Sequence, residues 1–69
     1  MYKERRKALG WSRADLANKA HVNKATLQLI EMGQSLDDES IARIEEVLSR
    51  TEAGEKDVML PRVAVGKKS

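Results

Sequence analysis

The chain has 69 residues, of which 41% are hydrophobic and 35% charged, with a single histidine and no cysteine. A chain of this length forms one small domain, and without cysteine it has neither a disulfide framework nor a cysteine-based zinc site. His21 alone leaves a histidine-based metal site or a catalytic triad without partners. No apolar run approaches the roughly 20 residues of a membrane span, and the first ten residues lack the apolar stretch of a secretion signal. These features predict a cytoplasmic protein that is not an enzyme and needs no cofactor or metal.

The charges are unevenly distributed along the chain. Residues 1–24 hold seven basic and two acidic residues, residues 25–57 three basic and nine acidic, and residues 58–69 three basic and no acidic residue. Such segregation places positive potential at one end of a small protein, as binding to a phosphate backbone requires. The plainer alternative is that each cluster only solvates a helix face.

Two short helices are predicted in the first twenty residues. Residues 2–9 are mostly good helix formers, and Gly10 follows where a left-handed cap is wanted. A second helix is expected over residues 13–20. Ser12 is a natural N-cap for it, and Asp15 three residues later completes a capping box.

Two further helices are predicted in the middle of the chain. Asn23 is placed to cap a helix over residues 24–32. A fourth helix is expected over residues 37–50, with a second capping box formed by Ser35 and Asp38. Its apolar residues recur on one face, as in a helix that packs on a core, and they are Ile41, Ile44, Val47 and Leu48.

The composition changes after residue 50. Residues 51–57 form a polar linker, residues 58–65 are β-prone but interrupted by Pro61, and residues 66–69 are a basic tail. We therefore expect an all-α fold: a small four-helix domain with a helix-turn-helix over residues 1–50. Residues 51–69 would form a linker and a C-terminal arm that is extended, dimerising or disordered.

The segment from Ser12 to Gly33 has the pattern of a helix-turn-helix, since two short helices are joined by only a few residues. Ala17 is small enough to let the second helix approach the first closely. The other apolar positions suit packing at a steep angle; they are Leu16, Ala20, Val22, Leu27 and Ile30. The pattern alone leaves open whether the motif binds DNA.

This stretch resembles the helix-turn-helix of the phage lambda-type repressor and Cro family, also called the XRE family. The matching run over residues 9–33 reads LGWSRADLANKAHVNKATLQLIEMG. The features that carry the resemblance are Leu9-Gly10, Leu16-Ala17, Thr26-Leu27 and Ile30-Glu31-Met32-Gly33. The match covers residues 5–33 well and the helix over residues 37–50 loosely.

The resemblance implies a structural ion pair between Arg6 and Glu31, which would tie two helices together. It also exposes two departures. His21 stands where the family has glycine, so the turn is expected to differ locally, because a left-handed backbone suits histidine less well. The fifth helix that family members use for dimerisation has no obvious counterpart.

The resemblance also assigns DNA contacts. The positions that read bases in the family are held here by Lys24, Ala25, Gln28 and Leu29. Gln28 can form hydrogen bonds with adenine, and Lys24 can donate to guanine or to a phosphate. Ala25 and Leu29 can contact thymine methyl groups. Flanking or phosphate contacts are expected from Ser12, Arg13, Asn23, Thr26 and, more weakly, Lys19. Lys3, Arg5 and Lys7 would extend the basic face, whereas Met32 replaces a polar family residue. For each polar side chain, an ordinary solvated surface role is the alternative.

The leading hypothesis is a phage- or plasmid-type transcriptional regulator that binds an inverted-repeat operator. Because one such unit buries little DNA surface, we expect a homodimer on half-sites about 34 Å apart. The candidate dimer surfaces are the helix over residues 37–50 with its following segment, and residues 58–65. The alternative is a protein-interaction module or antitoxin that uses Leu29 and residues 58–65 to bind a protein partner.

Overall fold

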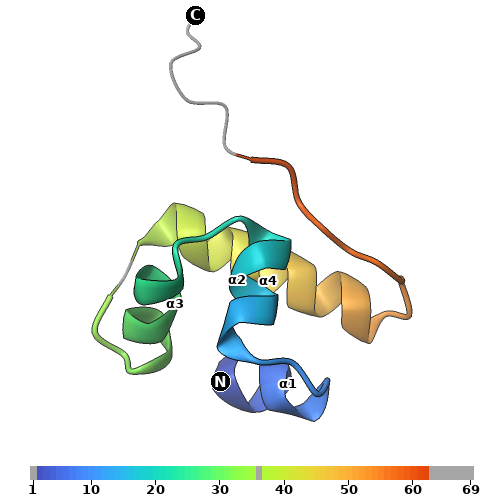
Figure 1. Ribbon diagram of the computed structural model, residues 1–69, viewed down its shortest axis with the longest axis horizontal. Helices are drawn as coiled ribbons and strands as arrows, with labels where there is room; N and C mark the ends of the chain where they lie inside the picture. Colours follow the sequence, from blue (N-terminus) through green and yellow to red (C-terminus); the bar gives the residue numbers. More distant parts are fainter. Residues whose placement is uncertain (1, 36, 63–69) are drawn as a thin grey trace, which may run out of the picture.

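The structure, a computed structural model, describes residues 2–35 and 37–62. It contains four helices: α1 (Tyr2–Ala8), α2 (Arg13–Ala20), α3 (Lys24–Glu31) and α4 (Asp38–Glu52). In Figure 1 the long α4 lies across the molecule, α2 and α3 pack against it, and α1 lies below them. The described residues contain no strand, so the all-α prediction is confirmed.

The predicted helix boundaries agree with the structure to within two residues. Those of α2 coincide with the prediction, whereas α1 ends one residue earlier, at Ala8. Helix α3 also ends one residue earlier, because Met32 forms its C-cap, and α4 runs two residues further, to Glu52. The differences lie at helix ends, where the caps and the last turn decide the boundary.

The capping box at the start of α2 is present as predicted. The Asp15 amide donates to Ser12 Oγ at 3.0 Å, and the Ser12 amide donates to Asp15 Oδ2 at 2.8 Å. The bond from the Ser12 backbone lowers the pKa of the Asp15 carboxyl. Asn23 caps α3, since its Oδ1 accepts from the amides of Ala25 at 2.8 Å and Thr26 at 3.4 Å.

The second predicted capping box, at Ser35 and Asp38, is wrong. The N-cap of α4 is Asp37, and its side chain makes no cap hydrogen bond to the backbone. It accepts instead from the Ser40 hydroxyl at 2.9 Å. The chain is still extended at Asp37 and Asp38 is the first helical residue, so Asp38 cannot occupy the third position that a box requires.

The core lies where α2 packs against α3 and α4. Leu16, Leu27, Ile44, Val47 and Leu48 have no exposed surface. Ala17 and Ala20 are also buried, so α2 presents small side chains to its neighbours and these helices approach closely, as the sequence predicts. The core is completed by two residues from beyond α4, Val58 and Leu60.

The segment over residues 55–62, which we call the arm, runs back along the domain (Figure 1). Val58 and Leu60 are 4% and 5% exposed, and the Leu60 amide donates to the Lys19 carbonyl at 2.7 Å. Arg43 of α4 donates to the carbonyls of Ala20, at 2.7 Å, and Pro61. The first part of the predicted 58–65 pairing segment is therefore packed on its own chain. Its end, residues 63–65, and the basic tail lie outside the described residues.

The turn between α2 and α3 keeps the left-handed geometry, although histidine replaces glycine there. His21 has φ 52° and ψ 51° and caps α2. The following amide, of Val22, donates to the Ala17 carbonyl at 3.0 Å, which closes the helix end. The expectation that histidine would alter the turn is wrong, because the bonds that end α2 hold the backbone in this region.

His21→Gly is expected to stabilise the domain by about 0.5–1 kcal/mol. A left-handed conformation costs an L-residue roughly 1–2 kcal/mol, and the greater chain entropy of glycine offsets about half of that gain. The melting temperature should rise by a few degrees, while His21→Ala gives no gain because alanine keeps its Cβ. A lower melting temperature for the glycine variant would contradict a strained turn.

Candidate nucleic-acid interface

The outer side of α3 is open to solvent. Leu27 and Ile30 are 0% and 6% exposed and fix the inner side of the helix on the core. The four predicted base-reading residues all lie on the exposed side: Lys24, Ala25, Gln28 and Leu29. Leu29 is 42% exposed. Packing within the chain does not explain why a leucine stands at this position beside the core face.

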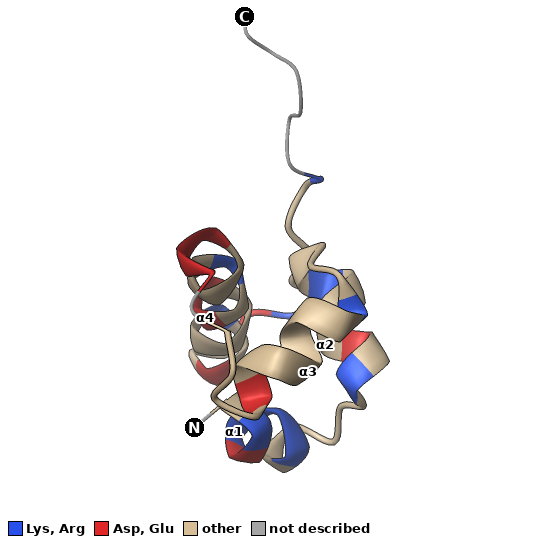
Figure 2. Cartoon of the chain, turned by 90° about the vertical axis from the view of Figure 1, so that its left-hand side faces the viewer, with Lys and Arg blue, Asp and Glu red and all other residues tan. Residues whose placement is uncertain are grey.

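Helix α3 stands at the front of the domain when Figure 1 is turned by 90° (Figure 2). Helices α2 and α4 lie to either side of it and α1 below. A B-DNA major groove is about 12 Å wide and admits one α-helix. Helix α3, with its exposed side outward, has the size of an element that this groove admits.

A buried carboxylate holds the far end of α3. Glu31 accepts from Arg6 of α1 at 2.8 Å and from Arg13 of α2 at 3.2 Å, and only 2% of its side chain is exposed. Arg6, whose side chain is 6% exposed, also donates to the Trp11 carbonyl at 2.8 Å. The contact between Arg6 and Glu31 is the ion pair that the family resemblance implies, and with Arg13 it joins three helices.

The pKa of Glu31 reflects two opposing effects. Burial raises it, but the hydrogen bonds and charges of Arg6 and Arg13 outweigh burial and bring the pKa below its ordinary value. Glu31 is therefore ionised at neutral pH. Its charge balances the buried Arg6, and the position of α3 relative to α1 and α2 depends on it.

Most of the predicted flanking residues lie at the start of α2 and the start of α3, and some of their polar atoms already have partners within the chain. The Ser12 amide is bonded to Asp15, and the Asn23 carbonyl oxygen is used by the cap of α3. Arg13 donates its Nε to Glu31 and keeps 34% of its side chain exposed. Thr26 is half-buried. Of these groups, the Arg13 guanidinium has the charge and the exposure for a phosphate.

Lys19 lies over an aromatic ring. Its Nζ is 5.0 Å from the centroid of the Trp11 ring, a cation–π contact. Both residues are half-buried, and Trp11 packs against the core. This contact places the Lys19 side chain over the Trp11 ring.

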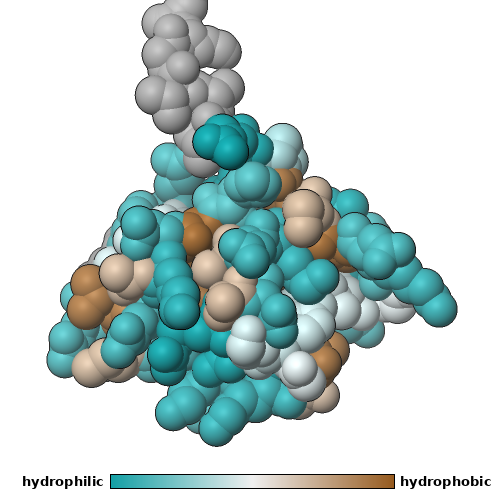
Figure 3. Space-filling view, viewed as in Figure 1, coloured by the Kyte–Doolittle hydropathy of each residue, from teal (hydrophilic) through white to brown (hydrophobic). Residues whose placement is uncertain are grey.

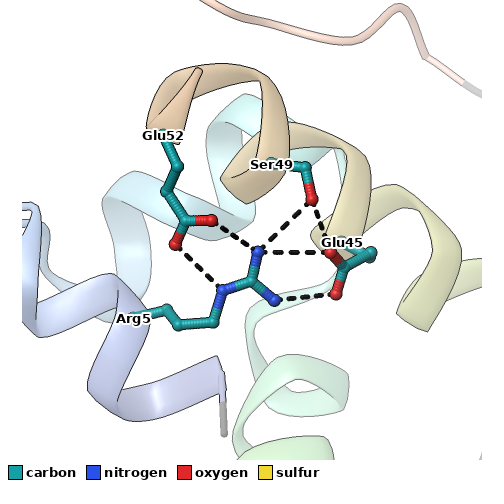
Figure 4. Close-up of polar contacts among 4 residues, drawn as sticks. All are labelled: Arg5, Glu45, Ser49 and Glu52. Atoms are coloured by element: carbon teal, nitrogen blue, oxygen red, sulfur yellow. Dashed lines mark hydrogen bonds and ion pairs between the residues drawn. The ribbon is translucent and has the colours of Figure 1, made fainter. Parts of the chain in front are cut away.

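Arg5 does not extend the basic face, contrary to the expectation from sequence. It donates to Glu45, Ser49 and Glu52 of α4 (Figure 4), with the nearest contacts to Glu45 at 2.8 Å and to Glu52 at 2.7 Å. The bonds to Glu52 and Glu45 raise the pKa of the guanidinium. Arg5 therefore joins α1 to α4, whereas Lys3 and Lys7 are exposed.

Among the helices, α4 carries most of the acidic residues. Figure 2 shows acidic residues at the start of α4, whereas basic residues mark α1 and the region around α2 and the start of α3. The large hydrophobic residues exposed in the described chain are Leu29, Met32 and Met59. On the face shown in Figure 3, hydrophobic residues reach the surface as small separate areas.

Sequence reasoning missed the surface that the arm forms with the turn. A shallow groove there is lined by residues of α2, the turn and the arm, namely Ala17, Asn18, His21, Val22, Asn23, Met59 and Arg62. Nothing in the local pattern around Arg62 indicates this neighbourhood. It arises only because Val58 and Leu60 are drawn into the core.

Metal-binding clusters and membrane-spanning helices were not found among the described residues. Residues 2–35 and 37–62 hold no group of histidine and acidic side chains that could bind a metal ion. Within the same residues, no helix combines the length and the apolar character needed to cross a membrane.

The chain matches the helix-turn-helix family over residues 3–54, a range that contains α2, α3, α4 and most of α1. No curated protein and no solved structure gave a match. The family range, the helix-turn-helix formed by α2 and α3 and the outward side of α3 agree with one another. The protein belongs to the helix-turn-helix family of Cro/C1 type, the XRE family, and carries its DNA-binding regulatory domain.

Proposed function

We propose that the protein is a transcriptional repressor of phage or plasmid type, which inserts α3 into the major groove of an inverted-repeat operator. The observation that carries the proposal is the open side of α3, backed by the buried Leu27 and Ile30. Family membership supports DNA binding and regulation. A phage- or plasmid-type repressor acts where bacterial DNA lies, so the proposal places the protein in the cytoplasm.

The roles of the base-reading residues follow from their chemistry. Gln28 has the donor and the acceptor that a bidentate contact to adenine needs, and Lys24 can donate to guanine or to a phosphate. Ala25 and Leu29 provide apolar contacts for thymine methyl groups. All four side chains are exposed.

The phosphate contacts of the proposal lie beside α3. Arg13 is the principal anchor because its guanidinium is partly exposed while Glu31 orients it. Thr26, the Asn23 amide group and Ser12 are secondary contacts. Lys19 adds a positive charge along α2, held over the Trp11 ring. Phosphate contacts of this kind fix register and carry no base preference.

The proposal includes a homodimer, because tight operator binding needs two half-sites about one helical turn apart. Helix α4 uses its apolar side for the core, and its exposed residues are mostly acidic. Two such acidic faces would repel each other in a symmetric contact. We therefore infer that the two copies do not pair through α4 in the absence of DNA, and that they pair when both are bound to adjacent half-sites.

Selection from a random pool of duplex DNA tests the proposal. The expected product is an inverted repeat whose half-site centres are about 10 base pairs apart or a multiple of that. A gel shift on the selected sequence should show specific binding that weakens as salt rises. A pool without enrichment, together with no binding at low salt, would rule out the repressor.

Gln28→Ala should cost roughly 1–3 kcal/mol of binding free energy on the cognate site and relax the base preference at one position. Arg13→Ala should instead weaken cognate and random DNA alike. Affinities of both variants for both DNAs check this, after thermal melts establish how much Arg13→Ala destabilises the fold through Glu31. Equal losses for the two variants on both DNAs would remove the distinction between reader and anchor.

A second candidate function is a protein-interaction module or antitoxin. It is favoured by the exposed apolar residues at the end of α3, where Leu29 and Met32 are 42% and 57% exposed. In the described part of the 58–65 segment, Val58 and Leu60 are buried, and Met59 is the large hydrophobic residue left exposed. Absence of salt-sensitive DNA binding in the gel shift would favour this candidate.

A further inference from the structure

We propose that the arm makes a second contact with the DNA backbone, in which Arg62 binds a phosphate beside the point where α3 enters the major groove. This inference rests on the proposed DNA binding. It adds a contact outside the helix-turn-helix, contributed by a segment that lies beyond the residues matching the family.

The arm is held in place immediately before Arg62. Val58 and Leu60 are buried in the core, and the Leu60 amide bonds the Lys19 carbonyl at 2.7 Å. Arg43 bonds the Pro61 carbonyl, one residue before Arg62. The backbone position of Arg62 is therefore set by α2 and α4, so little backbone entropy is lost when Arg62 binds.

The surroundings of Arg62 suit an anion. It lines the groove together with Asn18, His21 and Asn23, all exposed polar residues, and none of the described residues lining this groove is acidic. The Asn23 carbonyl oxygen is used by the cap of α3, so its amide nitrogen is the group left to donate outward. A guanidinium with amide donors beside it matches the oxygens of a phosphate.

The groove is continuous with the reading surface. Asn23 lines it and is also the N-cap of α3, and the next residue is Lys24, the first base-reading position. Arg13 lies near the opposite end of α3, where it meets Glu31. Arg62 and Arg13 thus mark the two ends of α3, as contacts to the two backbones that border one major groove would require.

Charge favours DNA over a protein as the occupant of this groove. Residues 58–69 contain three basic residues and no acidic residue, so the chain that follows Arg62 adds only positive charge. The lining also includes apolar side chains, those of Ala17, Val22 and Met59, beside the polar groups. A contact with a sugar-phosphate strand satisfies both features.

The test compares Arg62→Gln with Lys56→Gln in the full chain. Both residues are exposed, both lie in the arm and both changes remove one charge, but only Arg62 lines the groove. Affinity for the selected operator and for random duplex DNA is measured over a range of salt concentrations. Arg62→Gln should weaken both by roughly threefold to tenfold and reduce the slope of log K against log salt by about 0.9, whereas Lys56→Gln should change neither.

The outcomes separate this inference from the proposed function. Arg62→Lys should restore most of the slope, since a lysine can also neutralise a phosphate. Equal effects of Arg62→Gln and Lys56→Gln on DNA affinity would mean that only the net charge matters. No effect of Arg62→Gln would mean that Arg62 does not contact DNA. Either result overturns the inference. Gln28→Ala would still test α3 independently, and unchanged melting temperatures show that both glutamine variants fold.

Discussion

Glu31→Gln is expected to lower the free energy of unfolding by about 3–5 kcal/mol, the range for removing one member of a buried ion pair. The amide keeps the size of the side chain but cannot balance Arg6, whose side chain is 6% exposed. For a domain of this length the total stability is roughly 3–10 kcal/mol, so the variant should lose a large share of its stability. Urea denaturation followed by circular dichroism measures the loss.

Glu46→Gln is the matched control. Glu46 pairs with Arg50 at 3.1 Å on the exposed side of α4, and such surface pairs contribute at most about 0.5 kcal/mol. A loss for Glu31→Gln no larger than that for Glu46→Gln would show that the buried pair is not important for stability. Replacing Arg6 and Glu31 together by leucine should recover part of the loss, because no uncompensated charge then remains inside.

Acid titration gives an independent readout of the same residue. Its pKa is lowered in the folded state, so its contribution is fully present above the ordinary value of 4.5 and is lost as the pH falls through the folded-state pKa. The stability of the unmodified chain should therefore fall more steeply below pH 4.5 than that of Glu31→Gln. Parallel curves for the two proteins would contradict the lowered pKa.

Leu60→Ala is expected to cost about 2–5 kcal/mol, as for other buried leucines. Leu60 is 5% exposed and lies in the core beside α2 and α4, although it belongs to a segment without regular structure. Its loss removes apolar contacts and leaves a cavity under the arm. Thermal and urea denaturation measure the change in the free energy of unfolding. Without the Leu60 side chain, the arm should also hold the backbone of Arg62 less firmly.

Met59→Ala provides the comparison within the same segment. Met59 is 58% exposed, so its truncation should change the stability by less than about 0.5 kcal/mol. The alternation of buried Val58, exposed Met59 and buried Leu60 is the pattern under test. Similar small effects at positions 59 and 60 would mean that the arm does not pack on the domain in solution.

Features that depend on neighbours in the chain were predictable from the sequence. The capping box of Ser12 and Asp15 involves residues three apart, and Asn23 caps the helix that begins beside it. The phase of α3 follows from the apolar Leu27 and Ile30, which place Gln28 and Leu29 outside. These signals involve one or two helical turns, and a sequence displays them directly.

Features that depend on distant residues were not predictable. Arg5 looked like one more base of a positive face, yet its partners Glu45 and Glu52 are 40 and 47 residues away. The arm looked like a separate tail because its β-prone residues have no strand to pair with in the sequence.

The sequence by itself thus determined the helix-turn-helix, its caps and the side of α3 that is left exposed, because these rest on the helical repeat and on hydrogen bonds between near neighbours. Only the tertiary structure decided which charges are paired and where the arm lies. The reason is physical: a buried side chain or an ion pair is selected by whichever groups the fold brings within a few ångströms, and the chain order does not record that proximity. The position of Arg62 beside the turn is the clearest example of a proximity that only the fold creates.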